Sequence, residues 1–203
     1  MKRTAKGRVG YVRYEKVKRF IITFIMFAIP IGIYISAWKI SGTNRNIMTI
    51  VAILGIIPAA RFAVSFIMIW LQRDADPAVV EVTEKSAGGL VHGYELTVTA
   101  YEGRMPLDAL VICGNEVVCC SVHGKADQFS FMEKHITRIL NSNGYFGSNV
   151  RIFSDVRKYE DRVKQLAADP EKYRAGIDFK PDEQYPDLSR EELILHTIMA
   201  ISV

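Results

Sequence analysis

The sequence predicts an α+β protein in which two long apolar helices precede a small domain of mixed helices and strands. Residues 20–38 contain no charge, and residues 47–71 contain only Arg61. About twenty apolar residues are enough for a helix to cross the hydrocarbon core of a membrane. After residue 71 the apolar residues recur with the shorter periods of strands and amphipathic helices. We expect a basic cytosolic tail over 1–19, a transmembrane hairpin over 20–71, a cytosolic α/β domain over 72–168, and a polar excursion with a terminal helix over 169–203.

Basic residues predict the orientation of the hairpin. Eight Lys and Arg residues precede the first apolar run against one acid, Glu15, which gives this tail a net charge of +7. The loop between the runs carries only Lys39 and Arg45. Because basic flanks stay in the cytoplasm, we expect a multi-pass protein of the cell membrane with both termini cytoplasmic. A cleaved signal peptide is the alternative, but its apolar region is shorter and ends in small residues, unlike Tyr-Ile-Ser-Ala-Trp at 34–38.

The charge is divided between the membrane part and the rest. The whole chain is +4, and removing +7 for the tail and +3 for Lys39, Arg45 and Arg61 leaves −6 for residues 72–203. An acidic domain disfavours non-specific binding of nucleic acid, which needs a basic surface. The basic tail is instead suited to anionic membrane lipids, and the residues expected at the lipid interface are Arg13, Lys16, Lys18 and Arg19. The alternative is that the tail serves only as a topology signal.

Arg61 is the one charged residue within the second apolar run. Entering from outside near Asn46, it lies fifteen residues along the helix, roughly 22 Å deep and near the inner edge of the core. From there its long side chain can extend to the cytosolic headgroups. Pro58 precedes it and can kink the helix. Arg61 is therefore expected to be a lipid-interface anchor, and the alternative is a residue that binds or gates.

The rest of the sequence predicts one domain with the element order α-β-β-β-α-β-α, followed by a terminal helix. Asp76 and Pro77 are typical of a helix start, Gly114-Asn115 of a tight hairpin turn, and Ser189 with Glu192 of a capping box. Alternation from Tyr94 predicts a half-exposed first strand. The expected helices cover 77–86, 129–141, 156–166 and 190–201, and the expected strands cover 94–101, 107–113, 116–122 and 149–153.

This order resembles the core of the restriction-endonuclease-like fold, α-β-β-β-α-β. In that family an acid in the second strand and an acid-x-Lys pair in the third hold a divalent metal. Pro106-Leu107-Asp108 matches the first element, so Asp108 is the candidate catalytic residue. The third strand reads Val-Val-Cys-Cys-Ser-Val at 117–122 and lacks the pair, while His123 and Lys125 lie off the pattern. The resemblance therefore implies a degenerate fold without nuclease chemistry, because one acid does not complete a magnesium site.

A second resemblance covers most of the chain. Gly10-Tyr11-Val12, the segment 54–60 with Ala63-Val64, and the segment 150–153 near Lys158-Tyr159 are similar to a family of uncharacterised two-span membrane proteins from clostridial bacteria. Some members carry a label like that of an O-linked GlcNAc transferase. We do not expect that activity here, because the chain has no GxGxxG motif and no helical repeat.

The remaining side chains of catalytic type form no known motif. Cys113, Cys119 and Cys120 lack zinc or redox spacing, and adjacent strand residues point to opposite faces. They are expected to be buried structural thiols. The four histidines show no metal-binding spacing, so we expect no metal and no cofactor.

Two functions remain open. The favoured one is a membrane-anchored cytosolic module that binds or scaffolds, with lipids and a protein partner or a second copy as its partners, and with no enzyme activity. The alternative is a membrane-bound, metal-dependent hydrolase of phosphodiesters or nucleotides that uses Asp108. The position of Asp108 decides between them. Convergence in one cleft with Glu95 and any of Glu116, His123 or Lys125 favours the hydrolase, whereas capping a turn or pairing with Arg104 favours the binding module.

Overall fold

The computed structural model describes residues 4–42, 47–101, 103–177, 179 and 185–202. These residues form two compact units. One unit is Val12–Gln72, and the other combines Lys2–Tyr11 with Arg73–Val203. We call them the hairpin and the domain, and each is described by itself.

The hairpin consists of α1 (Tyr11–Ser41) and α2 (Ile47–Trp70). Both helices are long and apolar enough to cross a membrane, and only 11% of the most apolar window of each is buried. Large apolar side chains therefore cover the outside of this unit. The helix α2 continues through Pro58, as α1 does through Pro30.

Small and polar groups hold the two helices together. A Cβ atom added at Gly55 would lie 3.2 Å from the Cβ atom of Pro30, so the backbones approach closely there. The hydroxyl of Thr23 donates to the carbonyl oxygen of Phe62 over 3.2 Å. Because lipid is as apolar as leucine, close packing and hydrogen bonds are what associate helices within a bilayer.

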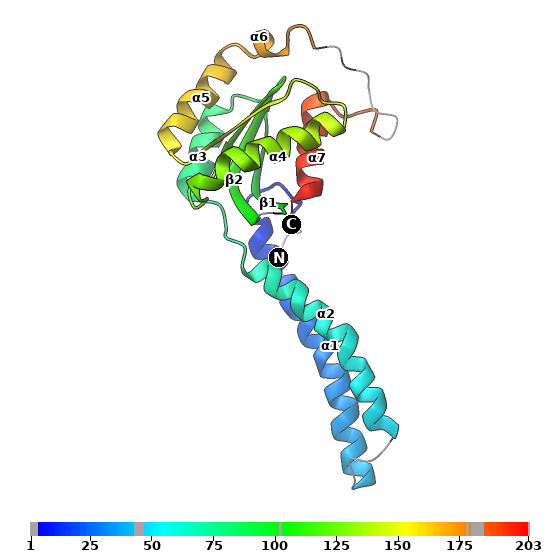
Figure 1. Cartoon of the computed structure of the whole chain (residues 1–203). Coiled ribbons are helices and arrows are strands. Elements are labelled where there is room, and N and C mark those ends of the chain that lie inside the picture. Colours follow the sequence, from blue (N-terminus) through cyan, green and yellow to red (C-terminus); the bar gives the residue numbers. More distant parts are fainter. Residues whose placement is uncertain (1–3, 43–46, 102, 178, 180–184, 203) are drawn as a thin grey trace. The chain divides into compact units, whose positions relative to one another are not determined.

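The domain is built on a four-stranded sheet in the order β1-β2-β3-β4 (Figure 1). The pairs β1–β2 and β2–β3 are antiparallel, and β3–β4 is parallel. The parallel pair requires a crossover, which α4 supplies. The strands are β1 (Val91–Ala100), β2 (Gly103–Cys113), β3 (Glu116–Cys120) and β4 (Asn149–Phe153). The helices are α3 (Pro77–Ser86), η1 (Ala126–Gln128), α4 (Phe129–Ser142), α5 (Val156–Ala168), α6 (Pro170–Arg174) and α7 (Arg190–Ile201).

Helices cover both faces of this sheet and give two apolar cores. On one face α4 and α7 contribute Met132, Ile136 and Ile194 to a core shared with β1–β4. On the other face α3 and α5 contribute Val79 and Tyr159. The result is a three-layer α/β/α arrangement, which confirms the predicted mixed α+β class.

Most of the predicted elements are confirmed, with two corrections. Asp76 caps α3, and Ser189 with Glu192 forms the capping box of α7. The half-exposed first strand is wrong: β1 begins at Val91 and is buried from Gly93 to Val98, because both faces of the sheet are covered. The polar excursion also contains α6, a short helix that the sequence pattern did not reveal.

Candidate functional site

Two buried acids of the domain, Glu95 and Asp108, lie at one point of the sheet. They occupy neighbouring positions of β1 and β2, between the pairs Tyr94–Ala109 and Leu96–Leu107. Tyr94 belongs to one core, whereas Leu96 belongs to the other, so the strand changes face at Glu95. The φ angle of Glu95 is +55°, a left-handed conformation that is rare for this residue type. Strained backbone of this kind is found where the surrounding structure holds it.

Both carboxylate oxygens of Asp108 accept hydrogen bonds from the backbone. Oδ1 accepts from the N–H of Asp76, 3.1 Å away, and Oδ2 accepts from the N–H of Val122, 2.8 Å away. The side chain thus joins the start of α3 to the segment that follows β3. With Asp108 only 4% exposed, these bonds satisfy two backbone donors that would otherwise be left without partners.

Glu95 binds the residues that precede α1. Its Oε1 accepts from the N–H of Gly10 over 2.8 Å, and the N–H of Tyr94 donates to the carbonyl oxygen of Gly7 over 2.9 Å. The ammonium of Lys6 donates to the carbonyl oxygens of Met199 and Ser202 at the end of α7. The segment 5–10, here named the N-terminal segment, is therefore packed on β1 and α7 within the domain.

Ser121 and Glu116 of the predicted third strand have partners other than Asp108. Ser121 donates its hydroxyl to the carbonyl oxygen of Pro106. Glu116 lies at the opposite end of β3, where it pairs with Arg162 over 2.9 Å and binds the amide of Asn149. Within the described part of the chain, no three His, Cys, Asp or Glu side chains lie together as a metal site would need.

The three cysteines are buried thiols. Cys119 contributes to the core under α4 and α7, and Cys120 to the core under α3 and α5, as the alternation of strand side chains requires. Burial, with a smaller contribution from Asp108 and two other acids, raises the pKa of Cys120 to about 12. Burial also raises the pKa of Cys119 and Cys113. Neutral thiols of this kind are weak nucleophiles and poor metal ligands.

The basic residues expected at the lipid interface lie in the hairpin. Arg19 donates to the hydroxyl and the carbonyl oxygen of Ser65 in α2 and also pairs with Glu15. Lys18 pairs with Glu15 over 2.9 Å. Arg13 is exposed, and Lys16 is half-buried. Arg19 therefore both links the two helices and carries positive charge at the end of the apolar run.

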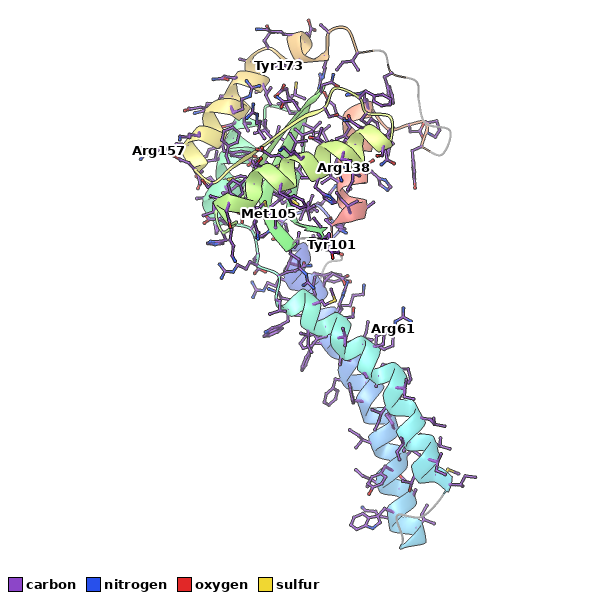
Figure 2. The ribbon with its side chains drawn as sticks, in the orientation of Figure 1. Arg61, Tyr101, Met105, Arg138, Arg157 and Tyr173 are labelled. Atoms are coloured by element: carbon purple, nitrogen blue, oxygen red, sulfur yellow. The ribbon has the colours of Figure 1, made fainter. Side chains whose placement is uncertain are left out.

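Arg61 extends away from both helices of the hairpin (Figure 2). The bond from Thr23 to Phe62 places this part of α2 level with Thr23, three residues into the first apolar run. That is about 5 Å along the helix from the start of the run. The guanidinium of Arg61 can span this length, which is the geometry that a snorkelling anchor needs.

Comparison with known proteins finds no matching family model, no matching curated protein and no matching solved structure.

Proposed function

We propose that this chain is a membrane-anchored cytosolic module that binds or scaffolds a partner. The observation that carries the proposal is the double backbone hydrogen bond of Asp108, which gives the best catalytic candidate a structural role. By the criterion drawn from the sequence, a capping role for this carboxylate favours the binding module. The apolar outer surface of the hairpin supports the anchor.

The orientation is part of the proposal. Both termini face the cytoplasm, because the basic residues before and within the start of α1 stay on that side. Anionic lipids are partners of Arg13, Lys16, Lys18, Arg19 and Arg61, with about 1 kcal/mol for each basic residue near the surface. A protein partner or a second copy is a further expectation.

We also propose that the domain is a degenerate relative of the restriction-endonuclease-like fold. Three features support this assignment: the strand order β1-β2-β3-β4, the antiparallel second strand, and a fourth strand parallel to the third after a crossover helix. The sequence resemblance to clostridial two-span membrane proteins belongs to the same proposal. Neither resemblance implies an enzymatic activity for the domain.

The alternative function, a metal-dependent hydrolase of phosphodiesters or nucleotides, has one observation in its favour. Glu95 and Asp108 are both buried at the same level of the sheet, 5% and 4% exposed. Both carboxylates already accept hydrogen bonds from backbone N–H groups, which leaves them fewer lone pairs to offer a metal. A single pair of acids also leaves most of the octahedral shell of magnesium to water.

The test uses the full chain in detergent with magnesium or manganese, single- and double-stranded DNA and RNA, and a generic phosphodiester. We expect no metal-dependent cleavage. Cleavage that disappears in Asp108→Asn, a variant that keeps one acceptor oxygen, would establish the hydrolase instead. Extraction of membranes at alkaline pH tests the anchor: the protein should remain with the lipid, and release into the supernatant would contradict it.

A further inference from the structure

The two edge strands of the sheet differ in what covers them. The edge of β1 is covered, because Tyr94 bonds to the N-terminal segment and Val98 forms a bridge with Ser202. The edge of β4 borders an open groove of about 630 Å³ between β4 and α4. That volume is within the range of roughly 300–1,000 Å³ typical of small-molecule sites.

Three cations line this groove. Lys134 and Arg138 are four residues apart on α4 and so share one side of the helix, and Arg151 borders the groove from β4. All three are exposed, and within the described residues none of their side chains has a hydrogen bond or ion pair. Arg162 and Arg174 in the same domain are paired with carboxylates. Unpaired cations gathered in one hollow of an acidic domain make a local positive field.

The one acidic residue among those that line the groove, Glu133, already accepts a hydrogen bond. Glu133 accepts from the N–H of Ile152 over 2.8 Å through its Oε1. This N–H points away from β3, so the carboxylate occupies the position that an added strand would need. A peptide that extends the sheet is thereby disfavoured, and a compact ligand that leaves this bond intact is favoured.

A polar side chain of the groove also lacks a partner. The Oδ1 atom of Asn141 is buried and accepts no hydrogen bond from the described residues. A buried polar atom without a partner costs about 1–3 kcal/mol, so turning this side chain into the groove, where a ligand hydroxyl can donate to it, would be favourable. Ser142 and Asn149 supply further polar groups along the same wall.

We propose that the groove between α4 and β4 binds a phosphate monoester that carries hydroxyl groups. Lys134, Arg138 and Arg151 contact the phosphate, and Asn141 accepts from a hydroxyl. A guanidinium binds phosphate oxygens with two parallel hydrogen bonds, and three cations match the charge of about −2 on a phosphate monoester better than the single charge of a carboxylate or a halide. This deepens the proposed binding function by naming a ligand class, and the phosphate group comes either from a soluble metabolite or from a lipid headgroup.

The experiment uses the full chain in phosphatidylcholine nanodiscs, with inorganic phosphate, glucose 6-phosphate and glucose as calorimetric probes. We expect saturable binding of glucose 6-phosphate, weaker binding of phosphate and none of glucose. In the double variant Lys134→Ala/Arg138→Ala the affinity for glucose 6-phosphate should fall at least about tenfold. The matched control is Arg157→Ala, an exposed arginine on α5 outside the groove, and it should bind as the wild type does.

A second arm separates the two sources of phosphate. Adding phosphatidic acid to the nanodisc should weaken glucose 6-phosphate binding if a headgroup fills the groove, and should leave it unchanged if the ligand is soluble. The inference is overturned if glucose 6-phosphate does not bind, if the double variant binds it equally well, or if a single-stranded oligonucleotide displaces it from the groove. These outcomes leave alkaline extraction from membranes unaffected, so failure here is distinguishable from failure of the proposed anchor.

Discussion

The hairpin and the domain use apolar side chains in opposite ways. In the hairpin, large residues such as Phe24 and Ile57 are 67% and 66% exposed, whereas Gly55 and Pro30 form the contact between helices. In the domain, Leu110 and Ile136 are fully buried. A surface of the first kind is stable in lipid and not in water, where large exposed apolar patches promote association. This difference is the one expected if the hairpin is folded for lipid and the domain for water.

The largest expected effect on stability comes from comparing the substitution of one leucine in each unit by alanine. Leu110→Ala leaves a cavity between α4, α7 and the sheet and should lower the free energy of unfolding of the domain by about 2–5 kcal/mol. Leu54→Ala, at a residue 58% exposed, should change it by less than about 0.5 kcal/mol. Both changes in free energy can be measured by urea titration of the full chain in detergent. Labelling of the buried thiols at pH 8 reports the fraction unfolded. Equal losses would contradict the division between the units.

The thiols suit this measurement because all three lie in the domain and none in the hairpin. With the pKa of Cys120 raised to about 12, this thiol is neutral at pH 8 while the domain is folded. Because unfolded thiols ionise near their usual pKa of 9.0, the domain should lose stability as pH rises above about 9. Labelling at pH 8 therefore reports opening of the domain before this loss begins.

Substitutions of Asp108 test whether this residue, the best catalytic candidate, has a structural role. Asp108→Ala leaves the N–H groups of Asp76 and Val122 without acceptors and should destabilise the domain by about 2–4 kcal/mol. Asp108→Asn retains one acceptor oxygen and should lose about half as much. Glu116→Ala, which breaks a partly exposed pair with Arg162, should cost under about 1 kcal/mol. If Asp108 instead served catalysis and not structure, Asp108→Ala would cost the domain little stability.

Close packing in the hairpin is tested at two glycines. A side chain at Gly55 meets Pro30, whereas a Cβ atom at Gly32 has nothing within 4 Å. Gly55→Leu should separate the helices at a cost of about 1–3 kcal/mol, and Gly32→Leu should not. Cysteines placed at Phe20 and Phe66, whose rings lie 5.7 Å apart, give a crosslinking yield that reports the separation. A yield lowered equally by both variants would refute the contact.

A smaller effect is expected at Glu95. Glu95→Ala removes the acceptor for the N–H of Gly10, at a cost of about 1 kcal/mol, while Glu95→Gln retains an oxygen there. The N-terminal segment should then open more often, and trypsin should cleave after Lys6 and Arg8 faster in the alanine variant. The glutamine variant should be cleaved at the wild-type rate. Cleavage unchanged by either substitution would show that Glu95 does not hold this segment.

The same contrast explains what the sequence could predict. Helix caps and hydrophobic periodicity depend on residues close together in the sequence. The sequence therefore predicts the caps Asp76 and Ser189 and the bounds of α4 and α7. The buried state of β1 depends on helices far along the chain, which the alternation from Tyr94 does not encode. The partners of Asp108 are backbone groups 32 and 14 residues away, so its structural role was not predictable. The groove cations belong to α4 and β4, and only the sheet order brings them together.

The placement of the two units across a membrane is the central claim, and cysteine labelling in intact cells tests it most directly. Lys39→Cys lies near the loop of the hairpin, and Tyr101→Cys is fully exposed on the domain. Both variants keep the three native thiols, which are buried. We expect a membrane-impermeant maleimide to label Lys39→Cys in intact cells and to label Tyr101→Cys only after permeabilisation. Labelling of Tyr101→Cys in intact cells, with Lys39→Cys protected, would contradict the claim.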